Sequence, residues 1–284
     1  MLTVYAPAKL NLVLEVLGKY GNEYHQVFSI MQTINFCDIL NFEPAREISF
    51  NCDEPGLKHD NLVIQATKLL KEVTKYSGGV RIELYKRIPW GTGLGGGSSD
   101  AAATLLALNT LWALSLPVSN LACLASRLGS DIPFFVFGGT ALVEGMGEKV
   151  TPLPPMPRAY FVLLVPPLPP IPGKTKQLYT KLSDSHFTKG QFVHAVLPSL
   201  MENKIPAPAS MFNAFEKVVF DVFPKLEEYK KAFEQAGATN IHLAGSGPAL
   251  FTLVYKKKEA KELCLHLQRQ GLRSYVASSI LTNG

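Results

Sequence analysis

The sequence is poor in cysteine, with four cysteines among 284 residues. They lie far apart, in apolar surroundings, without paired spacing and with few histidines nearby; they are Cys37, Cys52, Cys123 and Cys264. This pattern argues against a disulfide scaffold and against a zinc motif of the usual spacing. We therefore expect reduced thiols in the core and no structural zinc.

The beginning of the sequence lacks a recognisable targeting segment. It reads MLTVYAPAKLNLVLEV, without the charged start and apolar core of a signal peptide and without the Arg and Ser bias of a transit peptide. A cytoplasmic location is the expectation that follows from this pattern and from the cysteines.

Strong charge of either sign is also missing. The net charge is +5, and Lys256–Lys258 is the one basic run, which is typical of a solvated turn. We therefore predict no nucleic-acid partner, whereas a small anionic substrate suits this charge balance. With 47% hydrophobic and 18% charged residues, the composition is that of a soluble globular protein rather than a disordered one.

Charged residues are absent from Ala101 to Ala125, which is long enough to suggest a membrane span. Polar residues interrupt the stretch, however, and Pro117 with Ser119 resembles the end of one helix and the cap of the next. The stretch therefore predicts two buried helices, and no membrane partner.

The most informative segment that is present is PWGTGLGGGSSD at Pro89–Asp100, with five glycines and two serines. It follows a strand-like alternation at Val80–Lys86 and precedes an Ala/Leu-rich helical run. Glycines at a helix start let an anion approach unpaired backbone N–H groups, so we predict a phosphate-binding loop. A flexible surface loop is the alternative. The candidates for the helix N-cap are Ser98, Ser99 and Asp100.

Two well-known nucleotide motifs do not fit the glycine-rich segment. No lysine follows its last glycine at the place that the Walker pattern requires, and the glycine spacing of the Rossmann fingerprint also fails. A dinucleotide site is therefore not expected.

The hydrophobic pattern predicts a mixed α+β fold. The expected strands are Leu2–Ala6, Leu10–Val16, Val27–Ile34, Ile48–Cys52, Val80–Lys86, Ala159–Val165, Ile241–Leu253 with a GSG turn inside it, and Arg273–Ser278. The expected helices are Asn61–Tyr76, Asp100–Leu114, Ser119–Leu128, Thr175–Leu182, Met211–Val219, Pro224–Ala236 and Glu259–Gln270. Nine of the 20 prolines fall between Pro152 and Pro172, which suggests a domain boundary near residue 155.

Three segments together resemble the signature motifs of the GHMP small-molecule kinases, over nearly the whole chain. They are PAKLNL at Pro7–Leu12, PWGTGLGGGSSDAAA at Pro89–Ala103 and LAGSGPALF at Leu243–Phe251. The resemblance implies a two-domain α+β fold with the active site in the interdomain cleft. The expected domains are an N-terminal ATP-binding domain, residues 1–155, and a C-terminal domain, residues 156–284.

Further marks resemble one branch of that family, whose members phosphorylate the 2-hydroxyl of 4-diphosphocytidyl-2-C-methyl-D-erythritol in the non-mevalonate route to isoprenoids. These marks are EYH at Glu23–His25, the elongated loop GLGGGSSDAAA, GSDIPFF at Gly129–Phe135 and GMGE at Gly145–Glu148. The resemblance implies an ATP-dependent kinase that uses Mg²⁺, and it does not identify the metal ligands. A monomer or weak homodimer is expected.

The resemblance assigns catalysis to two residues. Lys9 would stabilise charge and Asp131 would accept the proton of the substrate hydroxyl. Taken alone, Lys9 is a surface charge in a turn-like break between two strands, and Asp131 is a helix cap. The resemblance places ATP against Pro89, Trp90, Gly91, Thr92, Gly93, Leu94, Gly95, Gly96, Gly97, Ser98, Ser99 and Asn61.

Substrate recognition would use Tyr24 to stack on the cytosine and His25 to read its polar edge, unless the two are simply a core Tyr and a surface His. Tyr179 is a candidate for the opposite face of the base, and Asn11 for the erythritol. The third motif departs from the family pattern, because Ala244 stands where Ser is usual and Ala249 replaces a common Thr. These departures, and the high proline content of PPLPPIPGKT, put the role of those two loops in doubt.

Other functions compete with this one. A kinase for mevalonate or homoserine shares the core motifs, but gives no reason for EYH or the elongated loop. A diphosphomevalonate decarboxylase of the same superfamily is a further enzyme alternative. A non-catalytic nucleotide-binding or RNA-binding module would be expected to have lost Lys9 or Asp131, and both are present.

Overall fold

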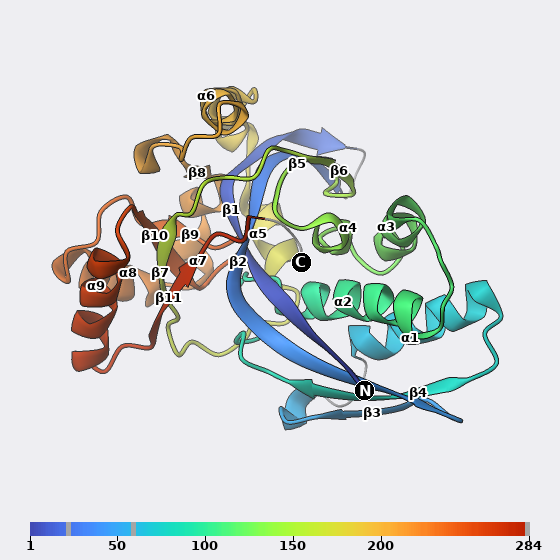
Figure 1. Cartoon of the computed structure of the whole chain (residues 1–284). Coiled ribbons are helices and arrows are strands. Elements are labelled where there is room, and N and C mark those ends of the chain that lie inside the picture. Colours follow the sequence, from blue (N-terminus) through green and yellow to red (C-terminus); the bar gives the residue numbers. More distant parts are fainter. Residues whose placement is uncertain (21–23, 58–60, 282–284) are drawn as a thin grey trace. The chain divides into compact units, whose positions relative to one another are not determined.

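The computed structural model describes residues 1–20, 24–57 and 61–281, and it has two compact units. Unit 1 consists of Met1–Ala8, Phe36–Pro89 and Gly95–Gly138, and unit 2 of Lys9–Asn35, Trp90–Leu94 and Gly139–Gly284. Both units combine helices with strands, so the predicted α+β class is confirmed (Figure 1). The domain boundary near residue 155 stays a prediction.

The described part of unit 1 contains four α-helices, two short strands and parts of two long strands. Its elements are β1 (Leu2–Tyr20), β2 (Tyr24–Ala45), β3 (Ser49–Cys52), β4 (Gly79–Tyr85), α1 (Leu62–Thr74), α2 (Gly96–Leu111), α3 (Val118–Ser126) and α4 (Ile132–Phe137). The strands β1 and β2 continue into unit 2. In this sheet the strand order is β3-β4-β2-β1-β8, and β5 pairs with β2 and β6.

Within unit 1 the strand register and the helix packing follow from the residue pattern. β4 pairs antiparallel with β2, from Ile39 opposite Tyr85 to Ala45 opposite Gly79, and parallel with β3. Helix α2 packs against α1 and α4, with most of its alanines and leucines buried. The uncharged stretch Ala101–Ala125 therefore forms parts of two helices, as predicted. No helix in the described ranges combines the length and hydropathy needed to cross a membrane.

Unit 2 has a sheet of its own, of order β11-β7-β10-β9, in which β7 pairs antiparallel with β10 and β11, and β10 pairs antiparallel with β9. The remaining strands and helices of this unit are β5 (Thr140–Gly145), β6 (Lys149–Pro152), β7 (Tyr160–Leu164), α5 (Lys174–Lys181), α6 (Gln191–Met201), β8 (Phe212–Asn213), α7 (Val219–Val222), α8 (Leu226–Gln235), β9 (His242–Leu243), β10 (Leu250–Val254), α9 (Lys257–Arg269) and β11 (Ser274–Ser278). Short 3₁₀ turns in the chain are Pro55–Leu57, Asp184–His186, Pro208–Ser210 and Ala214–Lys217.

The core of unit 2 is formed between its sheet and its helices. Helix α9 packs against β7 and β11 and buries Ala260, Leu263, Cys264 and Leu267, which have the spacing of one helix face. Of the four free cysteines, Cys52 and Cys264 are buried as expected. Cys37 is half-buried and Cys123 is exposed, so the expectation of a core position is wrong for Cys123.

The predicted break at Lys9 is wrong, because β1 runs without interruption from Leu2 to Tyr20. The residues from Ala8 to Val16 are all buried. A strand that is covered on both faces loses the alternation that marks a half-buried strand. The buried lysine therefore looked like an interruption in a pattern that is in fact continuous.

Helix α2 begins at Gly96, earlier than predicted, with Gly95 in the left-handed conformation before it. Ser98, Ser99 and Asp100 are consequently in the first helical turns and are not the N-cap. The alternating positive φ angles of Gly91, Gly93 and Gly95 explain the difference, because the glycine run itself turns the chain into the helix.

The helix predicted at Met211–Val219 is also wrong. Its first part forms β8, which pairs with β1, and α7 begins only at Val219. The side chain of Asn213 holds this segment. Its Oδ1 accepts the N–H of Phe215, and its Nδ2 donates to the carbonyls of Leu243 and Gly245, so side-chain hydrogen bonds take the place of helical backbone bonds.

Helix α6 was not predicted from the sequence, because Pro198 lies inside it. Strands β5 and β6 were not predicted either, and of α4 the sequence indicated only the start, at Asp131.

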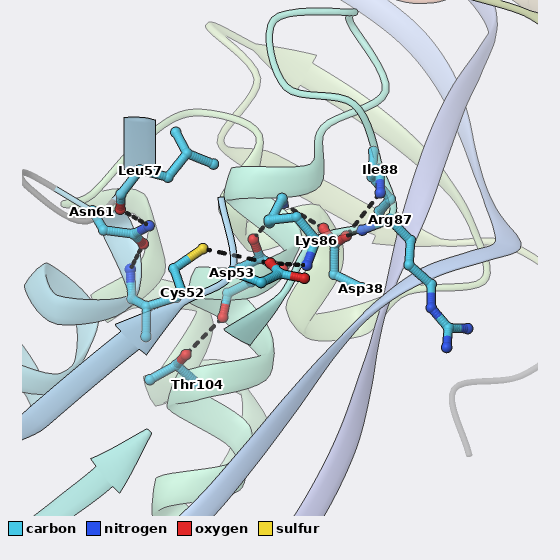
Figure 2. A network of polar contacts seen from close by, with 11 residues as sticks. Asp38, Cys52, Asp53, Leu57, Asn61, Lys86, Arg87, Ile88 and Thr104 are labelled. Atoms are coloured by element: carbon cyan, nitrogen blue, oxygen red, sulfur yellow. Dashed lines mark hydrogen bonds and ion pairs between the residues drawn. The ribbon is translucent and has the colours of Figure 1, made fainter. Parts of the chain in front are cut away.

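A buried ion triad joins three elements of unit 1 (Figure 2). The Nζ of Lys86 donates to Oδ2 of Asp38 and to Oδ2 of Asp100, the latter at 2.7 Å. The side chains of Lys86, Asp38 and Asp100 are 7%, 0% and 2% exposed. Asp38 also accepts the N–H groups of Arg87 at 2.6 Å and Ile88 at 2.8 Å. The triad thereby connects β2, the end of β4 and the start of α2.

The two carboxylates of this triad share one cation, Lys86, and this arrangement affects the protonation of Asp100. Burial raises the pKa of Asp100 to about 7; Lys86 acts against this rise and Asp38 adds to it. Burial disfavours the charged form of Lys86, but the carboxylates of Asp100 and Asp38 together favour it more strongly. The pKa of Lys86 is therefore raised. Asp100 therefore takes up a proton in the folded state at a pH where the unfolded chain has already lost it.

We expect the Asp100→Asn variant to lose a pH dependence of stability that the parent chain has. Because the folded pKa of Asp100 is raised from 3.8 to about 7, its contribution to the free energy of unfolding is present at low pH and is lost as pH rises through this window. Urea unfolding at pH 5, 6 and 7.5 measures the effect. The exposed Asp221→Asn variant is the control, and parallel pH curves for the parent and Asp100→Asn would contradict the prediction.

Candidate active site

The glycine-rich segment of unit 2, Trp90–Leu94, packs directly against the GSG turn at Gly245–Gly247. A Cβ added to Gly93 would lie 1.9 Å from the carbonyl oxygen of Ala244. The N–H of Ala249 donates to the carbonyl of Thr92 at 3.1 Å. Two motifs that are far apart in the sequence therefore meet backbone to backbone, which requires residues without side chains. The GSG turn is thus more than a hairpin connection.

Lys9 reaches the same place from β1. It is 4% exposed, and its N–H donates to the carbonyl of Leu94 at 2.9 Å. A Cβ on Gly245 would lie 3.0 Å from Nζ of Lys9 and 2.8 Å from the carbonyl oxygen of Gly93. The lysine of PAKLNL is therefore a buried residue beside the glycines and not a surface charge.

A chain of hydrogen bonds orients Lys9. Its Nζ donates to Oδ1 of Asn11 at 2.6 Å, the amide of Asn11 donates to Oγ of Ser29 at 2.9 Å, and Ser29 donates to the carbonyl of Val13. Lys9 and Asn11 lie on one face of β1 because side chains alternate along a strand. Sequence reasoning found Lys9 and Asn11 but missed Ser29, which belongs to a different strand and carries no motif.

Lys174 is a second buried lysine of this cluster, and the sequence did not mark it as a site residue. It begins α5, is 8% exposed, and its Nζ donates to the carbonyls of Gly91 (at 2.8 Å) and Gly247. Burial and, second, the charge of Lys9 lower the pKa of Lys174 to about 8. The sequence signal that could have found it is GKT, a lysine directly after a proline-glycine turn.

The aromatic candidates for the base are partly brought together. The rings of His25 and Tyr179 stack with centroids 4.6 Å apart, and Phe187, not predicted from the sequence, meets His25 edge-on at 6.0 Å. Tyr24 is 59% exposed at the start of β2. Glu23 of the EYH motif lies outside the described residues.

His25 has a lowered pKa, and one of its ring nitrogens lacks a hydrogen-bond partner among the described residues. Burial and the nearby charge of Lys19 lower its pKa. Its Nε2 atom is buried and has no hydrogen-bond partner among the described residues. A buried nitrogen of this kind normally has a partner, so a ligand atom would satisfy it.

In unit 1 the start of α2 offers backbone donors. The N–H of Ser99 bonds to the carbonyl of Gly95 at 2.9 Å, whereas the N–H groups of Gly96, Gly97 and Ser98 precede the first helical bond. The hydroxyl of Ser99 is buried and has no hydrogen-bond partner within the described ranges. Pro89 belongs to unit 1 and leads into the glycine-rich segment. This helix start has the backbone donors that an anion needs.

Two other predicted residues of unit 1 lie at helix starts. Asn61 caps α1, since its Oδ1 accepts the N–H of Val63 at 2.9 Å and its amide donates to the carbonyl of Leu57. Asp131 occupies the N-cap position of α4, and its carboxylate makes no capping bond to that helix. Asp131 therefore occupies the predicted N-cap position, but its side chain does not form the capping hydrogen bond.

A Mg²⁺ site would need oxygen ligands, which carboxylates supply. Among the residues that the structure describes, no three His, Cys, Asp or Glu side chains gather as a metal-binding group. A Mg²⁺ ion in a phosphoryl-transfer enzyme needs only one or two carboxylates together with substrate phosphates. The geometry assigns no protein ligand to it.

Comparison with known proteins places these features in one family. The models for the GHMP kinases N terminal domain and the GHMP kinases C terminal match residues 61–139 and 197–272. A 4-diphosphocytidyl-2-C-methyl-D-erythritol kinase of Dehalococcoides mccartyi is 43% identical over 281 residues, which are 99% of each chain.

Solved structures agree with the sequence relatives. A crystal structure of 4-(cytidine 5'-diphospho)-2C-methyl-D-erythritol kinase superimposes with a TM-score of 0.84 at 33% identity, over 100% of both chains. Homoserine kinase from Cytophaga hutchinsonii has a TM-score of 0.75 at 21% identity, over 99% of this chain and 94% of that one, and this shows the shared fold. The chain therefore belongs to the GHMP kinases, in the family of 4-diphosphocytidyl-2-C-methyl-D-erythritol kinases.

Proposed function

We propose that this protein transfers the γ-phosphoryl group of ATP to the 2-hydroxyl of 4-diphosphocytidyl-2-C-methyl-D-erythritol. The observation that carries the proposal is the cluster in which Lys9, held by Asn11, lies beside the joined glycine segments. The relatives named as 4-diphosphocytidyl-2-C-methyl-D-erythritol kinases match the chain over almost its full length. A cytoplasmic enzyme that acts as a monomer or weak homodimer is part of the proposal.

The ATP phosphates are assigned to the glycine-rich segment Pro89–Ser99, and the adenine to the region of Asn61. The start of α2 in unit 1 fits a phosphate group, because the N–H groups of Gly96, Gly97 and Ser98 precede the first helical bond and the buried hydroxyl of Ser99 has no hydrogen-bond partner among the described residues. Mg²⁺ would supply charge neutralisation on these phosphates.

The chemical step needs a proton acceptor and a cation. Asp131 takes the proton of the 2-hydroxyl, whose oxygen forms the new bond to the γ-phosphorus while the bond to the ADP oxygen breaks. Lys9 stabilises the negative charge that is spread over the transferring group. The products are ADP and the 2-phosphate of the substrate.

Substrate selection is assigned to Tyr24, His25, Tyr179 and Asn11. The neutral imidazole of His25 can read a polar edge of the cytosine through its unsatisfied Nε2 atom. Tyr24 offers an exposed ring for stacking, Tyr179 supports His25 through ring contact, and Asn11 contacts the erythritol.

An ATP-consumption assay with three acceptors tests the function directly. We expect turnover with the cytidyl-linked erythritol and little with mevalonate or homoserine. Equal turnover with all three acceptors would contradict the assigned substrate and leave only the kinase activity. No turnover with any acceptor would overturn the proposed function.

We expect Gly97→Val to weaken ATP binding at least about tenfold, because a branched side chain would occupy the place of a phosphate. Gly97 suits this test because the nearest atom to an added Cβ is 3.8 Å away and the fold can accept the change. Gly56→Val, at a position with open space, is the control. Calorimetric titration measures both, and unchanged affinity in Gly97→Val removes the helix start from the ATP site.

We expect Asp131→Asn to lower kcat by roughly 10²–10⁴ while ATP binding is retained, because the amide cannot accept the hydroxyl proton. Asp221→Asn changes an exposed carboxylate in the same way and should leave turnover unchanged. Steady-state kinetics with the cytidyl substrate provide the measurement. Near-normal kcat in Asp131→Asn would exclude it as the base.

We expect Tyr24→Ala to raise the KM for the cytidyl substrate about ten- to a hundredfold, since stacking on an aromatic ring contributes about 1–3 kcal/mol per base. The matched control is Tyr255→Ala, which removes a ring that is similarly exposed at 53%. His25→Ala should reduce discrimination between cytidyl and uridyl analogues. If both variants keep the parent KM and selectivity, base recognition lies elsewhere.

A further inference from the structure

Lys174 is held in a way that a structural link alone does not explain. Its Nζ joins the carbonyl of Gly91 to the carbonyl of Gly247, which ties α5 to the glycine segment and to the GSG turn. A neutral donor could form the same link. The chain instead places an ammonium group here, although the side chain is almost wholly buried and desolvation of a cation is costly.

The charges around Lys174 increase that cost. Among the described residues it has no carboxylate within salt-bridge distance. The segments Trp90–Leu94 and Gly245–Pro248 contain no titratable side chain, and β1 contributes another cation, Lys9. On its own helix, Lys176 and Lys181 are exposed, and Tyr179 is the remaining titratable group. An anion would compensate this arrangement.

We propose that Lys174 is a phosphate-binding residue of the transfer reaction, whose ammonium group holds the two glycine loops together and donates its third N–H to a phosphate oxygen. An ammonium has three donors, and two of them are used by the loop carbonyls. The phosphate belongs either to the nucleotide or to the diphosphate of the second substrate. This inference rests on the proposed kinase function.

The proposal has a pH signature. The pKa of Lys174 is lowered to about 8, first by burial and second by Lys9, and a bound phosphate favours the charged form. Affinity for the phosphate ligand is therefore close to full at pH 7 and falls as pH rises through 8, by about tenfold between pH 7 and pH 9. Arginine stays charged over this range, so Lys174→Arg should show a flat profile.

Binding experiments on the full chain test the role. Titrations use a non-hydrolysable ATP analogue with Mg²⁺ in one arm and the cytidyl substrate in the other. We expect Lys174→Met to weaken one of the two by roughly ten- to a hundredfold, whereas Lys176→Met, on the same helix but exposed, has no effect. The affected arm identifies which phosphate Lys174 contacts.

Several results would overturn the proposal. One is a lowered melting temperature of Lys174→Met with unchanged affinity for both ligands, which would leave a structural link only. Another is parallel pH profiles of affinity for the parent chain and Lys174→Arg, a comparison that does not depend on the folding of Lys174→Met. Turnover of the parent chain is measured separately, so loss of the proposed function and loss of the Lys174 role are distinguishable.

Discussion

The hydrogen-bonded ion pairs of the buried Lys86 with Asp38 and Asp100 are the interaction on which the start of α2 in unit 1 depends. They connect β2 and α2 to the chain directly before Pro89. A Cβ on Gly96 would lie 3.2 Å from Oδ2 of Asp38, so the backbone at Gly96 packs closely against the triad. Because removing one partner of a buried ion pair leaves an uncompensated charge, the three side chains form a single unit that fixes the direction of α2.

In unit 2, backbone contacts hold the glycine segment Trp90–Leu94 in place. Gly93 lies against the carbonyl oxygen of Ala244, and Gly245 lies against the carbonyl oxygen of Gly93, at distances that no Cβ would allow. The alanine at position 244, where the family usually has serine, meets Gly93 through its carbonyl oxygen. The departure from the family pattern therefore leaves this contact intact, because the contact uses backbone and not a hydroxyl.

Both units contain buried polar groups whose burial is costly to the folded state. Two lysines are buried near one another in unit 2, and the hydroxyl of Ser99 and Nε2 of His25 lack partners among the described residues. Each of these groups lowers the stability of the free protein. Under the proposed function, ligand atoms would satisfy such groups in each unit, so ligand binding should stabilise the folded state.

The sequence by itself determined the fold class, the family and most of the motif residues, because periodicity and glycine clusters are local properties of the chain. It located α1, α9 and the strands of the antiparallel sheet to within a few residues. It failed at Lys9, where burial on both faces removes alternation, and at Met211–Val219, where Asn213 binds the carbonyls of Leu243 and Gly245. Ser29 and Phe187 became visible only in the tertiary structure, since each acts through contacts with residues far away in the chain, and only the structure places Lys174 against Gly91 and Gly247.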